Sequence, residues 1–222
     1  MDCVYICRPG ENEELKYSIR SVDKNLSHDR IWIIGYKPNW YTGNYVEVED
    51  KSVKLENIRN CLSVVTKVGA ISDDFVLMND DFYILKPMGT LPTYHGGFLD
   101  DKISRYVAHS GSTRYTRVLG EASRDLKKRG IKQPLDYDIH TPMIMNKLKL
   151  KEIVGMNMAP RSTYGNIFNI GGTQIEDVKI YKYNNTVDMS PGVLSTEDNS
   201  LKLVKEMLEK EFSEPTRYEL SI

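Results

Sequence analysis

The sequence contains few cysteines, no long apolar run and no basic leader. Its three cysteines, Cys3, Cys7 and Cys61, are too few and too scattered for a disulfide framework or a zinc ribbon, so we expect them to be buried thiols. No run approaches the roughly 18 apolar residues that a membrane-spanning helix needs. The first residues also lack a basic start followed by a long apolar stretch. We therefore expect a cytoplasmic protein without a membrane span.

A surplus of positive charge is also missing. The chain has 30 Lys and Arg residues against 31 Asp and Glu residues, which gives a formal net charge of -1. Proteins that bind nucleic acid through its phosphates usually carry a strong positive field. The overall charge therefore gives no support for a nucleic-acid partner.

Several catalytic signatures do not occur. The sequence has neither the P-loop pattern nor the glycine fingerprint of dinucleotide binding, which removes the best support for an ordinary kinase or dehydrogenase. It also lacks a Gly-x-Ser-x-Gly nucleophile elbow and a zinc-binding helix pattern. Ordinary hydrolases lose their support in the same way.

What is present is a globular composition with α/β order. The 222 residues, 40% of them hydrophobic, correspond to one elaborated domain, 1–222, with halves 1–90 and 91–222. The first half alternates strands with amphipathic helices, which is typical of an α/β fold with a mostly parallel sheet flanked by helices. Ligands of such sheets bind beyond the carboxyl ends of the strands. We predict strands at 3–7, 30–35, 45–48 and 74–78, and helices at 11–24 and 54–68.

The second half has a less regular, α+β pattern. It predicts a helix at 113–128, a short helix after Pro142, and an amphipathic helix at 199–212 that packs on the main body.

The sharpest local signal is Asn79-Asp80-Asp81, which follows the apolar strand 74–78. Two adjacent carboxylates at a strand end repel each other, and a divalent cation with oxygen ligands relieves that repulsion. Mg²⁺ or Mn²⁺ held there would keep open positions for a diphosphate. The alternative is a polar turn with Asn79 as the turn former.

Two later segments could also carry chemistry. His140 follows an acidic stretch and precedes Pro142, and a histidine there could take the proton of an acceptor hydroxyl. A structural histidine bonded to the backbone is the alternative. Arg161 precedes a cluster of hydroxyl side chains that includes Tyr164, which suits contact with a phosphate, although the segment taken alone favours a surface loop.

Three segments together resemble a known family. The run from Asn12 to Val22, with Glu-Leu-Lys-Tyr-Ser-Ile-Arg-Ser inside it, the run Phe75 to Tyr83 around Asn-Asp-Asp, and His140-Thr141-Pro142 are similar in order and spacing to the Stealth-type sugar-phosphate transferases. That family includes bacterial capsular polysaccharide phosphotransferases and the catalytic part of the lysosomal-enzyme N-acetylglucosamine-1-phosphotransferase. The resemblance covers about the first two-thirds of the chain.

The resemblance implies a GT-A-like nucleotide-sugar-binding fold, a divalent metal and a UDP-sugar donor. It implies that Asp80 and Asp81 hold the metal and the donor diphosphate, that His140 is the general base, and that Arg161 neutralises phosphate charge. With Asp81, His140 and Arg161 as catalytic residues, the expected donor-binding set is Arg8, Asn12, Arg20, Asn57, Asn79, Asp80, Tyr164 and Asn166.

The chain departs from the family at its start. Where the family has a strand ending in Trp-Val-Asp-Gly, this chain has Val4 to Gly10, so Arg8 stands where the early Asp would be. The chain is also shorter than most members. A compact member of this kind, as expected in a phage or a polysaccharide locus, could transfer the glycosyl group instead of the glycosyl phosphate.

These observations favour a metal-dependent transferase that moves a glycosyl group or glycosyl 1-phosphate from a nucleotide-sugar to a hydroxyl of a saccharide. Modified DNA with a hydroxymethylated base is the alternative acceptor. A metal-dependent phosphodiesterase or nuclease is a further alternative, because Asp73, Asp74, Asp100 and Asp101 could join Asp80 and Asp81 in a two-metal site. A sugar- or nucleotide-binding protein without catalysis is the last. The sequence leaves the oligomeric state open.

Overall fold

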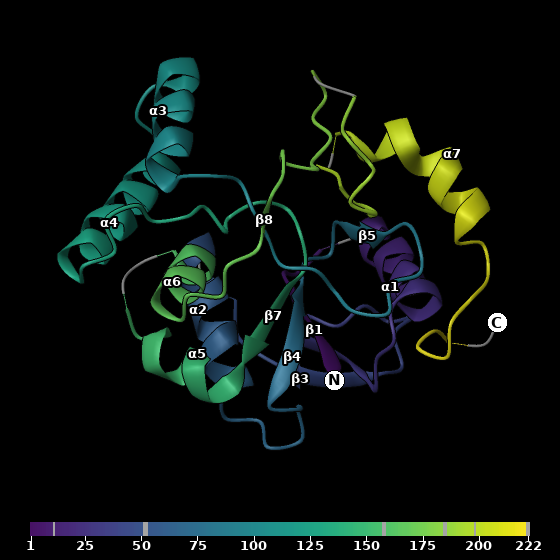
Figure 1. Ribbon diagram of the computed structural model, residues 1–222. Coiled ribbons are helices and arrows are strands. Elements are labelled where there is room, and N and C mark those ends of the chain that lie inside the picture. Colours follow the sequence, from purple (N-terminus) through teal and green to yellow (C-terminus); the bar gives the residue numbers. More distant parts are fainter. Residues whose placement is uncertain (11, 51–52, 157–158, 184–185, 198, 221–222) are drawn as a thin grey trace. The chain divides into compact units, whose positions relative to one another are not determined.

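The computed structural model divides into two compact units (Figure 1). Unit 1 comprises residues 1–91, 140–147 and 178–222, and unit 2 comprises residues 92–139 and 148–177. The structure describes all residues except 11, 51–52, 157–158, 184–185, 198 and 221–222. Residues 140–147 and 178–222 return to unit 1 after the chain has passed through unit 2.

A five-stranded, mostly parallel sheet forms the centre of unit 1. Its strand order is β3-β2-β1-β4-β7, and β4 pairs antiparallel with the edge strand β7 while the other pairs are parallel. The predicted α/β class is thereby confirmed. The strands are β1 (Asp2–Cys7), β2 (Ile31–Gly35), β3 (Asn44–Glu47), β4 (Asp74–Met78) and β7 (Met143–Asn146).

The central strands are continuous apolar runs because both of their faces are covered. Every residue of β2 is buried, and four of the five residues of β4 are. Helix α1 (Glu13–Asn25) buries Leu15, Ile19 and Val22, the face that its spacing predicts. Helix α2 (Lys54–Val65) contacts β2. Among the described residues, all three cysteines are buried and free, as expected.

The strand order creates a crevice at a defined place. The chain passes from β1 to β2 on one side and later to β4 on the other side of β1. The loops after β1 and β4 therefore diverge at the carboxyl edge of the sheet, which is the usual ligand position in open α/β folds.

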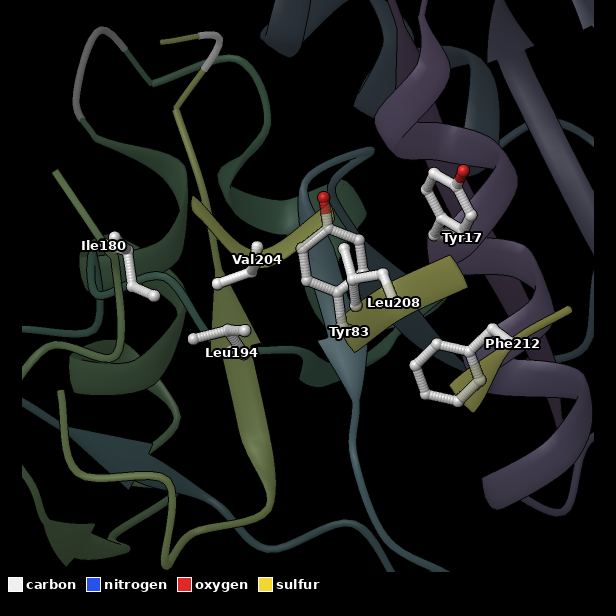
Figure 2. Close-up of a cluster of buried hydrophobic side chains, with 7 residues drawn as sticks. All are labelled: Tyr17, Tyr83, Ile180, Leu194, Val204, Leu208 and Phe212. Atoms are coloured by element: carbon white, nitrogen blue, oxygen red, sulfur yellow. The ribbon is translucent and has the colours of Figure 1, made fainter. Parts of the chain in front are cut away.

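The C-terminal segment of unit 1 packs on α1 and on a second small sheet. Strand β5 (Phe82–Ile84) pairs antiparallel with β9 (Val193–Ser195), and helix α7 (Leu201–Glu211) follows. Figure 2 shows how side chains from these elements meet α1 in one buried cluster. Its members are Tyr17, Tyr83, Ile180, Leu194, Val204, Leu208 and Phe212. The predicted C-terminal helix thus packs on the body of unit 1.

Unit 2 is mainly helical. Its core gathers Leu99, Leu119, Ala122 and Ala159. Its elements are β6 (Tyr94–His95), α3 (Leu99–Ser110), α4 (Arg114–Lys128), most of α5 (Lys147–Ile153), α6 (Pro160–Ile167) and β8 (Thr173–Gln174), with β6 and β8 paired in parallel.

The segment after Pro142 is a strand, and the prediction of a helix there is wrong. Burial alternates along β7, with Met143 and Met145 buried, because the segment pairs with β4 at the sheet edge. Pairing with a buried strand overrides the weak local preference, and the helix α5 begins only at Lys147. In the described part of the chain, no helix is both long and apolar enough to cross a membrane.

Candidate active site

A small polar pocket lies at the carboxyl ends of β1 and β4. Arg8 and Pro9 follow β1, and Asp80 follows β4, so the pocket lies at the crevice that the strand order predicts. Its cavity of about 170 Å³ is smaller than the roughly 300–1,000 Å³ of pockets that enclose whole ligands. The lining residues are Arg8, Pro9, Asn12, Glu13, Glu14, Asp80 and Leu201.

Asn79-Asp80-Asp81 forms the tight connection between β4 and β5. The backbone N–H of Phe82 donates to the carbonyl of Asn79 at 3.3 Å, so the polar-turn interpretation describes the backbone correctly. The two carboxylates of this turn have different surroundings.

Asp80 lies in the pocket and is held by Asn12. The Asn12 amide donates to Asp80 Oδ2 at 2.6 Å, while its Oδ1 accepts from the backbone N–H of Leu15 at 3.0 Å and caps α1. Burial raises the pKa of Asp80 above its ordinary value, and the charge of Asp81 raises it further, against the lowering effects of Asn12 and Arg8. A carboxylate in this position therefore gains from a nearby cation.

Asp81 is 7% exposed and offers its two oxygens differently. Its Oδ2 accepts from Lys179 Nζ at 2.8 Å and from Ser195 Oγ at 3.0 Å. Its Oδ1 is buried and accepts no hydrogen bond from the described residues. A buried acceptor without a donor is costly, and a bound cation would satisfy it.

The carboxylates therefore fit a divalent metal as a partial ligand set. Among the described residues, no group of three His, Cys, Asp or Glu side chains could hold a metal ion. Asp80 and Asp81 would supply two carboxylates, and the remaining positions would fall to water or to donor oxygens, as is usual for Mg²⁺.

His140 packs beside the strand that follows Asp81. Its ring meets Phe82 edge-on, with centroids 6.4 Å apart, and meets Tyr181 edge-on at 6.5 Å. Phe82 follows Asp81 directly, and Tyr181 lies two residues after Lys179. The structure thus brings His140 into the same part of unit 1 as the acidic motif.

Arg20, in contrast, faces the C-terminal segment. Its guanidinium makes two hydrogen bonds to Glu219, at 2.8 and 2.7 Å, and two to the carbonyls of Phe212 and Ser213, both at 2.9 Å. Neither Arg20 nor Asn57, which is buried on α2, lines the pocket. Their placement gives no support to the predicted donor-binding role.

Arg161, Tyr164 and Asn166 lie on α6 in unit 2. Arg161 Nε donates to the carbonyl of Tyr137 at 3.0 Å, and burial lowers the pKa of the guanidinium while nearby aspartates raise it. The Tyr164 ring packs on Phe168 with centroids 5.0 Å apart.

The amide of Asn166 makes three hydrogen bonds to backbone groups. It bonds the N–H and the carbonyl of Leu135 at 2.7 Å each and the carbonyl of Ser162 at 2.8 Å. These contacts indicate a structural role for Asn166, which holds the backbone of Leu135 against α6.

The two-metal hydrolase alternative loses Asp73 and Asp74 as additional ligands. Asp74 begins β4, whereas Asp80 follows the end of the same strand, so the two lie at opposite edges of the sheet. Asp74 accepts from Asn146 at 2.8 Å, and Asp73 pairs with Lys147 at 3.5 Å.

Lys179 and Ser195 are the residues of this site that the sequence did not reveal. They lie 98 and 114 residues from Asp81 and belong to no motif. Among the pocket residues, Pro9, Glu13, Glu14 and Leu201 were also missed. For Glu13 and Glu14 a signal existed, because they open the helix that follows β1.

No protein-family model matches the sequence, and no curated protein matches it, so the Stealth-type resemblance stands on its motifs. Among solved structures, 4-diphosphocytidyl-2C-methyl-D-erythritol synthase is similar with a TM-score of 0.47 and 9% identity, covering 93% of this chain and 98% of that one. The galactosyltransferase LgtC, in complex with donor and acceptor sugar analogues, is similar with a TM-score of 0.49 and 10% identity, covering 97% and 96%. At such low scores and identities, these likenesses carry no argument about activity.

Proposed function

We propose that this protein is a metal-dependent transferase with a GT-A-like fold. It moves a glycosyl group or a glycosyl 1-phosphate from a nucleotide-sugar to a hydroxyl group, preferably of a saccharide. The observation that carries the proposal is the adjacency of two different carboxylates. Asp80 lines the pocket at the carboxyl edge of the sheet. Asp81 has a buried Oδ1 that receives no donor from the described residues.

The charge of the pocket supports the metal requirement. Three of its side chains are acidic, Glu13, Glu14 and Asp80, and one is basic, Arg8. Glu13 is offset by Lys205 at 2.7 Å, and Glu14 accepts from Thr196 at 2.5 Å. A diphosphate would still meet more negative than positive charge, so its binding requires a cation that brings net positive charge with it.

Asp80 and Asp81 would hold that cation, with Asn12 keeping Asp80 in place. When bound, a divalent metal offsets the negative charge that grows on the departing phosphate. Arg8 would contact the donor phosphates from the loop after β1.

His140 would act on the acceptor. In glycosyl transfer, the acceptor oxygen bonds to the anomeric carbon, the bond from that carbon to the nucleoside diphosphate breaks, and His140 takes the hydroxyl proton. In glycosyl-phosphate transfer, the same oxygen bonds to the sugar-bound phosphorus, and the nucleoside monophosphate leaves. The role of Arg161 in stabilising the extra charge stays a prediction, because that residue belongs to unit 2.

The competing functions have less support. Hydroxymethylated DNA as acceptor has the net charge of -1 against it. A nuclease would need carboxylates on one edge of the sheet, and Asp73 and Asp74 lie at the other.

A thermal-shift panel tests the proposal. UDP-, GDP-, CMP- and dTDP-sugars are added with and without Mn²⁺ to the wild type, to Asp81→Ala and to Asp188→Ala, which removes an exposed aspartate bonded to Ser190. Ligand at 100 times its Kd stabilises by about 2.7 kcal/mol. We expect a metal-dependent shift for one donor that Asp81→Ala abolishes and Asp188→Ala retains. No shift with any donor would refute the donor site and make phosphodiester hydrolysis the next assay.

A further inference from the structure

Two side chains saturate one oxygen of Asp81 and leave the other open. Lys179 Nζ and Ser195 Oγ both donate to Oδ2, at 2.8 and 3.0 Å. Oδ1 is buried and receives no donor within the described part of the chain. The side chains of Lys179 and Asp81 are 15% and 10% exposed, so water competes little for this ion pair.

The backbone around these groups is tied together. Phe82, next to Asp81, pairs with Ser195 in the ladder between β5 and β9. Ser195 also forms a bridge to Lys179, and the N–H of Thr196 donates to the carbonyl of Asp81 at 3.3 Å. A two-stranded sheet and one isolated bridge therefore join three segments that are distant in the sequence, and they place both donors beside Asp81.

We infer that Lys179 and Ser195 are positioning residues that occupy Oδ2 so that Asp81 offers Oδ1 alone to the bound cation. This inference rests on the proposed function. Mg²⁺ needs near-ideal octahedral geometry, whereas Ca²⁺ accepts more oxygens and readily takes both oxygens of one carboxylate. A carboxylate restricted to one oxygen therefore favours Mg²⁺ or Mn²⁺ over Ca²⁺.

The test measures the affinities of Mg²⁺ and Ca²⁺, each added alone and in competition with Mn²⁺ followed by electron paramagnetic resonance. Ser195→Ala removes one donor without changing charge, and Lys179→Met removes the other while keeping most of the aliphatic chain. The lost ammonium charge affects both divalent cations alike, so the ratio of the two affinities reports the freedom of the carboxylate.

We expect each variant to raise the affinity for Ca²⁺ relative to Mg²⁺ by about tenfold, the scale on which residues that orient metal ligands act. Lys179→Arg keeps the charge and a donor, and it should return the ratio toward that of the wild type. Lys86→Met is the matched control, because that exposed lysine donates only to the carbonyl of Ser190 among the contacts identified, and it should leave the ratio unchanged.

The outcomes separate this inference from the proposed function. An unchanged ratio in Ser195→Ala and Lys179→Met, with a wild type that binds Mg²⁺, overturns the positioning role and leaves the metal site standing. A wild type that binds none of the three cations refutes the metal requirement itself. If Lys179→Met does not fold, Ser195→Ala decides the question alone.

Discussion

The ion pair between Arg20 and Glu219 should anchor the C-terminal segment to α1, and its removal should destabilise unit 1. The guanidinium meets both carboxylate oxygens, at 2.8 and 2.7 Å, and the two side chains are only 11% and 6% exposed. Removing one partner of a buried pair costs about 3–5 kcal/mol because the other charge stays buried. Lys16, 3.6 Å from Glu219, remains in Arg20→Met, so we expect about 3 kcal/mol, or roughly 6–12 °C in Tm.

The pH dependence of Glu219→Gln gives an independent check. Burial alone would raise the pKa of Glu219, but hydrogen bonds from Arg20 and Thr216 and the charges of Arg20 and Lys16 hold it below its ordinary value. Because the pKa of Glu219 is lower in the folded protein than the unfolded-state pKa of about 4.3, its ionised form stabilises the folded protein at pH values above the unfolded-state pKa. This stabilisation is lost as the pH falls through the folded-state pKa. The stability difference between wild type and Glu219→Gln should therefore be large at pH 7 and shrink toward pH 3.

Urea unfolding of Arg20→Met and Glu219→Gln measures both effects. Lys24→Met is the control, because the pair between Lys24 and Glu211 is half exposed and such pairs contribute about 0–1 kcal/mol. A stable Arg20→Met that has lost only donor affinity would refute the anchoring role. It would restore the prediction that Arg20 shapes the donor pocket.

Three further changes test the site and its frame. His140→Gln should lower the transfer rate by about 10²–10⁴-fold and leave the donor-induced thermal shift intact. The control is His109→Gln at an exposed position, which should change neither the rate nor the shift. An undiminished rate in His140→Gln would exclude His140 as the base. Asn12→Ala should lower the free energy of unfolding in urea by about 1 kcal/mol, because the cap of α1 is lost, and it should also weaken Mn²⁺ binding. A loss of stability with unchanged Mn²⁺ affinity would restrict Asn12 to capping. Gly35→Ala should lower the free energy of unfolding by about 3 kcal/mol, because φ is +116° and the added Cβ would lie 2.2 Å from the carbonyl oxygen of Cys7. The control is Gly69→Ala, where the added Cβ meets nothing within 4 Å. Equal melting temperatures of the two variants would contradict this prediction.

The α/β class was predictable because burial on both faces leaves a strong mark on a strand. The all-buried run of β2 and the helical spacing of Leu15, Ile19 and Val22 are local patterns. The edge strand β7 was not predictable in the same way. Its four residues follow Pro142, and only pairing with β4 decides between strand and helix.

The candidate site, too, was predictable only in part. Asp80 and Arg8 could be placed at the carboxyl edge of the sheet, because residues after parallel strands meet there. The partners of Asp81 could not, since the pairing of β9 with β5 brings Ser195 to it, and a bridge to Ser195 brings Lys179. The contact of Arg20 with Glu219 could not be predicted either, because the two residues are 199 positions apart in the sequence.

Nucleotide release from a nucleotide-sugar tests the central claim most directly. The donor selected by thermal shift is incubated with Mn²⁺ and a panel of saccharide acceptors, and the released nucleotide is identified chromatographically for the wild type and for Asp81→Ala. The account predicts metal-dependent release that needs an acceptor and is lost in the variant, as nucleoside diphosphate for glycosyl transfer or nucleoside monophosphate for glycosyl-phosphate transfer. Release that is equal in Asp81→Ala, or no release from any nucleotide-sugar with Mn²⁺ present, would contradict it.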